Sequence, residues 1–173
     1  MNIPDISIKK ILYTTDLSDS ALKAFAYAVS LANQYQAAIT ILHVMMDYSN
    51  MESRISRFIG KDNMDRLREN RMKEVWETLS GKRRENVMIK DALALFSDSA
   101  SNDEAGRGFV TDEVLVVKGN PVDQILAISR ERDCDLIVMG THGHGPIEDM
   151  IGSTARKVLR HSLIPVLAVR LTG

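Results

Sequence analysis

The sequence predicts an α/β fold: a single open, doubly wound, five-stranded parallel sheet with helices on both faces, of the Rossmann-like kind. The first observation is five short runs rich in Ile, Val and Leu, with little of the alternation typical of strands that are exposed on one face. These runs cover residues 11–15, 38–46, 113–118, 134–140 and 164–170. The second observation is that the connecting segments are too long for hairpins, and most carry helical spacing. Strand–helix–strand repetition implies parallel strands joined by right-handed crossovers.

Three of the connecting segments carry specific helix signals. After the first run, apolar residues fall on one helical face, with Ser18 and Asp19 before them as capping candidates. After the third run, Asn120 is a predicted N-cap and Pro121 occupies the first helical position. Before the fifth run, basic residues at 157–161 suit the last turn of a helix, where positive charge is favourable.

The composition limits the classes of protein to consider. The chain has 173 residues, 45% hydrophobic and 26% charged, with a net charge of −1, which suits one globular domain over residues 1–173, alone or with an insertion. The near-neutral charge gives no general reason to bind nucleic acid or an anionic membrane, and no run is long enough to span one. The single cysteine, Cys134, excludes an internal disulfide and is interpreted as a buried, unreactive thiol. With no secretory apolar segment in residues 1–10, these features predict a cytoplasmic protein.

The middle of the chain is less regular. Residues 50–85 predict one long helix or two, broken near Gly60, and their interspersed acidic and basic residues favour a solvated outer face over a membrane-surface helix. Residues 91–113 are acidic and loop-like after the apolar stretch 92–96. They predict either a flexible insertion or a short helix followed by a mobile acidic loop.

The stretch GTHGHGPIEDMIGSTARK, residues 140–157, places four glycines after the fourth run. One interpretation is a phosphate site, in which backbone N–H groups and the start of a helix at Gly152, Ser153 and Thr154 face an anion. The alternative is a flexible turn followed by one continuous helix from Pro146 through Leu159. Spacing alone leaves these two open, and the stretch is neither a P-loop nor a dinucleotide fingerprint.

Other candidate residues carry weaker signals. Asp16 follows the first run, where an aspartate is often only a turn residue. His43 lies inside an apolar run and is interpreted as a core histidine. His142 and His144 lack partners at metal-ligand spacing, so hydrogen bonding in the loop or contact with a polyanion is favoured over a metal site. No nucleophile elbow of a hydrolase is present.

Taken together, several segments resemble the universal stress protein family. They are ILYTTDLSDSALKAFAYAVSLA, ITILHV, GNPVDQILAISRERDCDLIVMGTHG and GSTARKVLRHSLIPVLAVR. The similarity runs over residues 9–48 and 114–171, leaving a long variable helical or loop insertion at about 50–112. The resemblance implies a five-stranded parallel α/β domain that forms homodimers, often through its last strand.

One branch of that family binds ATP through a G-x2-G-x9-G-[ST] motif, and the resemblance implies a site by position. Asp16 would lie by adenine and ribose, Val44 would contact adenine through its backbone, and Gly140 would contact ribose. The remaining implied residues are Thr14 and Thr15 lining the crevice, Gly143, Gly152, Ser153 and Thr154 holding the phosphates, and His142 beside them. This chain departs from the motif, because eight residues rather than nine separate Gly143 from Gly152.

The expected function is therefore that of a stress-response or regulatory homodimer that binds ATP, or ADP or AMP, with or without Mg²⁺. The alternative is a nucleotide-free interaction protein of the same family, acting through its dimer surface and its middle insertion. Slow ATP hydrolysis is a third, less favoured hypothesis, since no arrangement of the residues near the loop fixes an attacking water. No catalytic and no metal-binding residue is assigned.

Overall fold

The computed structural model describes residues 5–45, 51–69, 81–101, 110–141 and 151–170. Their centre is a five-stranded sheet in the order β3-β2-β1-β4-β5, in which every neighbouring pair is parallel. The strands are β1 (Lys10–Thr15), β2 (Ala38–Met45), β3 (Val110–Lys118), β4 (Leu136–Gly140) and β5 (Val166–Val169). All five predicted strands are confirmed, with ends that differ by at most three residues.

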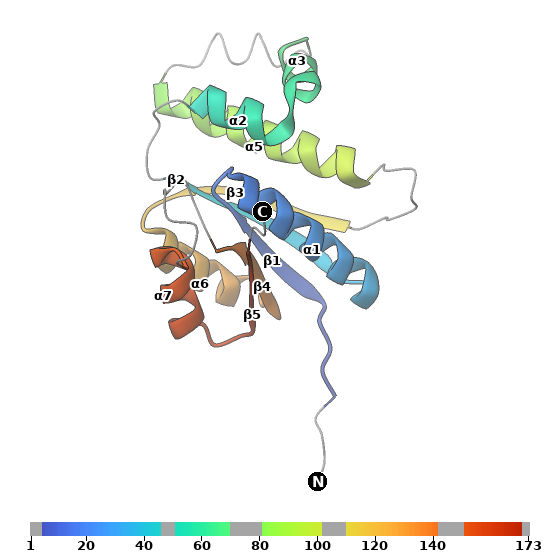
Figure 1. The fold of residues 1–173 in the computed structure, drawn as a ribbon, viewed down its shortest axis with the longest axis vertical. Helices are drawn as coiled ribbons and strands as arrows, with labels where there is room; N and C mark the ends of the chain where they lie inside the picture. Colours follow the sequence, from blue (N-terminus) through green and yellow to red (C-terminus); the bar gives the residue numbers. More distant parts are fainter. Residues whose placement is uncertain (1–4, 46–50, 70–80, 102–109, 142–150, 171–173) are drawn as a thin grey trace.

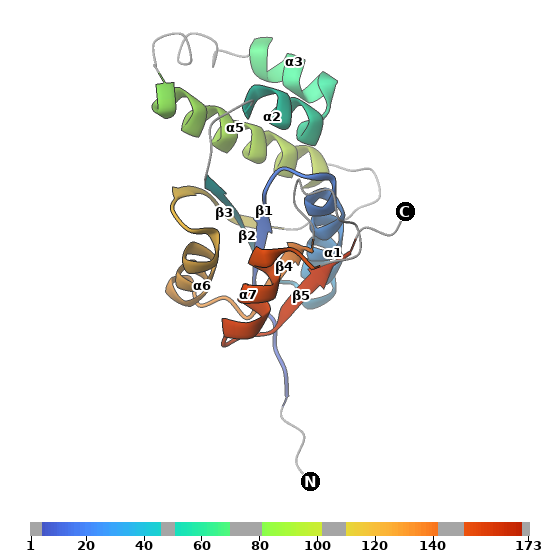
Figure 2. The same cartoon turned by 60° about the vertical axis from the view of Figure 1, so that its left-hand side comes forward.

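Helices cover both faces of this sheet (Figure 1). They are α1 (Asp19–Tyr35), α2 (Met51–Ile59), α3 (Lys61–Glu69), α5 (Gly81–Ser101), α6 (Pro121–Glu131) and α7 (Ser153–His161). One core cluster joins α1, α2, α3 and α5 to the sheet, and the second joins α6 and α7 to the opposite face. Figure 2 shows α2, α3 and α5 grouped together, away from α6 and α7.

Alternate strand residues supply the two clusters, as the period of a strand requires. Ile11 and Tyr13 of β1 face α1, whereas Leu12 between them faces α6 and α7. Because both faces are buried, the central stretches of the strands are largely apolar, and most of the charged strand residues lie towards the strand ends. This is the physical reason for the continuous apolar runs in the sequence.

The predicted caps are confirmed. Ser18 is the N-cap of α1, with its hydroxyl accepting from the backbone N–H of Ala21. Asn120 caps α6 by accepting from the N–H of Val122 at 2.9 Å, and Pro121 is the first helical residue. These contacts satisfy amides that have no partner inside the helix.

The insertion begins with two short helices, α2 and α3, as predicted by the second of the two alternatives for this region. They separate at Gly60, whose φ of +83° is readily adopted only by glycine. The expectation that the chain is loop-like after residue 96 is wrong up to Ser101, because α5 continues to that residue. Tertiary contacts stabilise the last turns of α5. Phe96 packs on Phe25 and Phe58. The buried Ser97 hydroxyl is hydrogen-bonded to that of Thr111 on β3.

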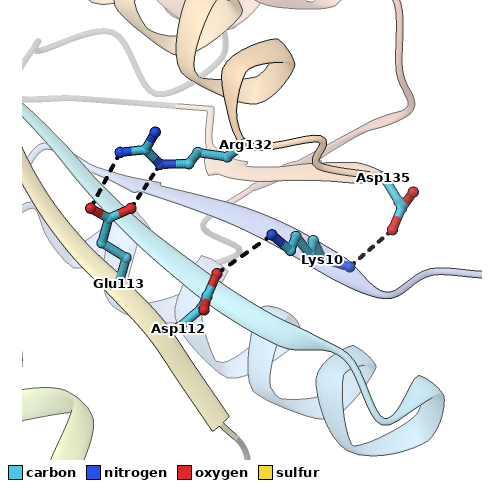
Figure 3. Close-up of polar contacts among 5 residues, drawn as sticks. All are labelled: Lys10, Asp112, Glu113, Arg132 and Asp135. Carbon is cyan, nitrogen blue, oxygen red and sulfur yellow. Dashed lines mark hydrogen bonds and ion pairs between the residues drawn. The ribbon is translucent and has the colours of Figure 1, made fainter.

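Charged side chains gather at the amino edge of the sheet (Figure 3). Arg132, which follows α6, makes a bidentate ion pair with Glu113 of β3. Its Nε donates to Oε2 at 2.7 Å and its Nη2 donates to Oε1 at 3.3 Å. The carboxylate of Asp135 accepts from the backbone N–H of Lys10, whose ammonium lies 3.8 Å from Asp112. These contacts tie the starts of β1, β3 and β4 together. Ligand sites of open parallel sheets lie at the opposite, carboxyl edge.

None of the helices in the described part of the chain is long and apolar enough to cross a membrane.

Candidate functional site

The strand order places a switch point between β1 and β4. The chain runs from β1 to β2 and β3 on one side of β1, and then returns to β4 and β5 on the other. In open parallel sheets, the loops that leave the two strands at such a point diverge and leave a crevice at the carboxyl ends. Here those ends are Thr15 with Asp16, and Gly140 with Thr141.

The loop after β1 is held by a dense set of hydrogen bonds. The hydroxyl of Thr15 accepts from the N–H of Leu17 at 3.0 Å, and the carbonyl of Thr15 accepts from Nδ1 of His43 at 2.8 Å. Leu17 has a φ of +62°, which is uncommon for a leucine, and its side chain is buried. Such a strained backbone conformation persists only where surrounding contacts hold it in place. The conformation of this loop is therefore fixed by the fold.

Within the described structure, only one oxygen of the Asp16 carboxylate accepts hydrogen bonds. Oδ1 accepts from both the backbone N–H and the hydroxyl of Ser18. Oδ2 has no hydrogen-bond partner among the residues that the structure describes. The side chain is only half-buried, so an acceptor oxygen is presented at the switch point. The Oδ1 contacts with Ser18 are those of a turn residue at a helix entry, the role that the sequence context alone favours.

Gly140 ends β4 against the start of α1. A Cβ at this position would overlap the hydroxyl oxygen of Ser20 and lie 3.1 Å from its carbonyl carbon. Only glycine therefore allows the first turn of α1 to approach β4 this closely. The requirement is steric, because Gly140 has no unusual backbone angle.

The far end of the glycine stretch returns to β4. The backbone N–H of Gly152 donates to the carbonyl of Thr141 at 2.7 Å, and a Cβ on Gly152 would lie 2.9 Å from that oxygen. Gly152 is the N-cap of α7, and no side chain among the described residues caps this helix. Ser153 and Thr154 form its first turn, so their N–H groups begin a helix beside the end of β4.

This geometry excludes one of the two interpretations that the sequence left open for the glycine stretch. A single continuous helix from Pro146 through Leu159 is wrong, because Ile151 and Gly152 are not helical and α7 begins at Ser153. His142 and Gly143, together with the eight-residue spacing, lie outside the described residues.

Two further predicted residues share the face of the sheet that α7 covers. Leu12 and Leu42 belong to the cluster with Ala155 and Val158 of α7, and Val44 packs against that cluster. By the alternation of strands, Thr14 points to the same face as Leu12. Val44 also lies one residue beyond the last pair of β1 with β2, Thr15 with His43. The structure thus places Thr14 and Val44 on the α7 side, and Asp16 at the edge between the faces.

The chain can be compared with known proteins once this site is described. The family model described as "Universal stress protein family" matches residues 7–170. The universal stress protein YxiE from Bacillus subtilis is 31% identical over 164 residues, which cover 93% of this chain and 98% of YxiE. The chain belongs to the universal stress protein family. The resemblance read from the sequence is confirmed at this level.

Solved structures of universal stress proteins show the same fold. UspA from Lactobacillus plantarum superposes with a TM-score of 0.64 at 23% identity, over 96% of this chain and 100% of that one. A universal stress protein in complex with cAMP gives a TM-score of 0.61 at 22% identity, over 95% and 98% of the two chains. The universal stress protein from Archaeoglobus fulgidus in complex with dAMP gives 0.51 at 20% identity, over 96% and 100%.

Two residues at the switch point were not assigned a role from the sequence. His43 is a core histidine, as expected, but only Nδ1 is bonded, and Nε2 is buried without a partner in the described residues. Burial lowers the pKa of His43 below its ordinary value of 6.5, and the nearby Arg54 guanidinium lowers it further, against opposing effects of Thr15 and Asp16. The ring is therefore neutral at pH 7.

Arg54, on α2, is the second unassigned residue. It is half-buried, and its Nη2 donates to the carbonyl of Asp16 at 2.6 Å. No sequence signal pointed to it, because its place depends on how the insertion packs on the sheet.

Proposed function

We propose that this universal stress protein binds an adenine nucleotide, ATP or its lower phosphates, at the carboxyl edge between β1 and β4. The observation that carries the proposal is the contact between Gly152 and Thr141, which sets the uncapped start of α7 beside the end of β4. An uncapped helix start at a switch point offers N–H groups and positive potential to phosphate.

The described residues fit such a ligand. Asp16 Oδ2 is an acceptor suited to a ribose hydroxyl, and Gly140, at the end of β4, would contact the ribose through its backbone. Ser153 and Thr154 would hold phosphate through their N–H and hydroxyl groups, while Thr14, Thr15 and the backbone of Val44 would border ribose and adenine. His142 and Gly143 would complete the phosphate loop from the undescribed part of the stretch.

Two relatives support adenine as the base, since the complexes with cAMP and dAMP are both those of universal stress proteins with this fold. Mg²⁺ would enter on the phosphates of the nucleotide. The described residues include no group of three His, Cys, Asp or Glu side chains able to hold a metal ion by themselves.

The test begins with the protein as purified. Heat denaturation followed by anion-exchange chromatography and mass spectrometry identifies any released nucleotide. The nucleotide-free protein is then titrated calorimetrically with ATP, ADP, AMP and cAMP, with and without Mg²⁺. Absence of binding at millimolar concentrations would refute the proposal.

A pair of variants locates the site. Asp16→Asn retains an oxygen for Ser18 but removes the carboxylate charge, and we expect it to weaken binding. Asp98→Asn, at an exposed position of α5, is the matched control and leaves binding unchanged. Equal affinities of the two variants would place the nucleotide elsewhere.

We further propose that the protein acts as a homodimer through β5, as a stress-response or regulatory module. β5 is an edge strand of the described sheet, and Leu163 just before it is 84% exposed. Such an edge offers unpaired backbone groups to a second copy. Leu163→Glu is expected to lower the molar mass measured by light scattering to that of a monomer, whereas Val110→Glu, at the opposite edge of the sheet, is not.

A nucleotide-free interaction protein is the competing proposal. The same edge and the exposed, charged sides of α2 and α3 support it. It becomes the preferred function if the titrations show no nucleotide binding.

A further inference from the structure

The insertion reaches the switch point through one side chain. Arg54 of α2 donates from Nη2 to the carbonyl of Asp16, the residue that follows β1. In the described structure this carbonyl is the sole hydrogen-bond partner of Arg54, and Nε of the guanidinium is buried without one. Charge strengthens such a bond, because the donor is ionised.

Arg54 is carried by a firmly packed helix. Its neighbour Ile55 is fully buried, and Phe58 and Ile59 are almost so. The ring of Phe58 lies 4.8 Å from that of Phe96 on α5, and Phe96 lies 4.8 Å from Phe25 on α1. This stack ties α2 to the rest of the core, so the position of Arg54 is set by the fold and not by a free surface side chain.

The loop that Arg54 touches has two consecutive carbonyls bound by side chains from elsewhere. His43 of β2 binds the carbonyl of Thr15, and Arg54 binds that of Asp16. The N–H groups of Leu17 and Ser18 are bound within the loop by Thr15 and Asp16. The peptide between Asp16 and Leu17 is thereby fixed from the insertion side, and with it the direction of the Asp16 carboxylate.

We infer that Arg54 is a positioning residue of the nucleotide site and makes the insertion a part of that site. It acts through Asp16: by holding the Asp16 carbonyl it orients the spare carboxylate oxygen towards the ribose. This inference rests on the proposed function. Since coupling between two sites is reciprocal, nucleotide bound at Asp16 also stabilises α2 in its place.

The experiment compares three variants of the full chain. Arg54→Met keeps the buried stem but removes the donors, Arg54→Lys retains a charged donor, and Arg57→Met alters an exposed arginine on the same helix. We expect Arg54→Met to weaken nucleotide affinity by up to about tenfold, because only the part of the charge-assisted bond energy that depends on bound nucleotide reaches the affinity, with Arg54→Lys in between and Arg57→Met unchanged.

Hydrogen exchange separates positioning from a general loss of stability. In Arg54→Met the amides of Leu17 and Ser18 should exchange faster, while those of β1 and β4 keep their wild-type rates. Nucleotide should slow the amides of residues 51–59 in the wild type and not in Arg54→Met. Faster exchange throughout β1 and β4, or wild-type affinity in Arg54→Met, would overturn the inference.

The two proposals fail in different ways. If the wild-type protein binds no nucleotide, the proposed function is refuted, and the exchange rates of Leu17 and Ser18 decide alone whether Arg54 positions the loop. If Arg54→Met does not fold, Arg54→Lys is compared with Arg57→Met by the same two measurements. Equal affinity and equal exchange in that pair would overturn the inference.

Discussion

The backbone N–H of Gly152 donates to the carbonyl oxygen of Thr141, just after β4, at 2.7 Å. This single contact determines where α7 begins, since Gly152 is its N-cap. It also sets the start of the helix beside the carboxyl end of β4. The approach is so close that a Cβ on Gly152 would lie 2.9 Å from the Thr141 oxygen.

Gly152→Ala is therefore expected to move the start of α7 away from β4. The backbone angles of Gly152, φ −54° and ψ 153°, suit alanine, so the effect comes from contact and not from conformational strain. We expect a loss of about 1–2 kcal/mol in the free energy of unfolding, measured by urea titration. Nucleotide affinity should also fall, because the N–H groups at the start of α7 would move from their place beside β4. Ser162→Ala, after the other end of α7, is the comparison variant and should spare affinity.

Gly140→Ala should destabilise the fold at the junction of β4 and α1. The new methyl group would overlap the hydroxyl of Ser20, and overpacking of this kind costs about 1–3 kcal/mol. The double variant Gly140→Ala with Ser20→Ala removes the worst overlap, so the two changes should be less destabilising together than their sum predicts. Strictly additive free energies of unfolding would show that the two residues do not meet as described.

The thiol of Cys134 should be inert in the native protein. Burial raises its pKa to about 11, so almost none is the reactive thiolate near neutral pH. We expect no modification by iodoacetamide at pH 8 over a time in which the urea-unfolded protein reacts completely, as followed by mass spectrometry. Rapid labelling of the native protein would mean that the segment before β4 opens frequently.

The outline of the fold could be predicted from local patterns because both faces of the sheet are buried. Continuous apolar runs marked all five strands, and the caps Ser18 and Asn120 marked two helix starts by their own short-range chemistry. The break at Gly60 was likewise visible, since a glycine was available to take a positive φ. In each case the signal lies within a few residues of the structure it determines.

The parts that the sequence did not reveal depend on distant contacts. The polar residues at 97–101 suggested a loop, but Ser97 hydrogen-bonds Thr111 across to β3 and the helix continues. Asp16 and Gly140 were expected at the site, whereas Arg54 was not. Nothing near Arg54 in the sequence indicates that α2 packs so as to bring its guanidinium to Asp16.

The last prediction concerns acid stability and His43. Burial, followed by the charge of Arg54, lowers the native pKa of this ring below 6.5, against opposing effects of Thr15 and Asp16. Well above pH 6.5 the ring is neutral in both the native and the unfolded state, so it adds no pH dependence there. As the pH falls below 6.5, the unfolded chain takes up a proton that the native protein resists. Stability is thus lost towards acid pH, by at most about 1.4 kcal/mol per pH unit.

His43→Asn tests this prediction, because an Asn amide can replace Nδ1 as the donor to the Thr15 carbonyl. The variant should be less stable than the wild type at pH 7.5, owing to the lost ring. The difference in free energy of unfolding should then narrow between pH 6.5 and pH 5, as the wild type alone loses the contribution of His43. For His161→Asn, a change at an exposed position, the difference in free energy of unfolding from the wild type should stay constant between pH 6.5 and pH 5. A constant difference across this range for His43→Asn would show that His43 takes up its proton equally in the native state.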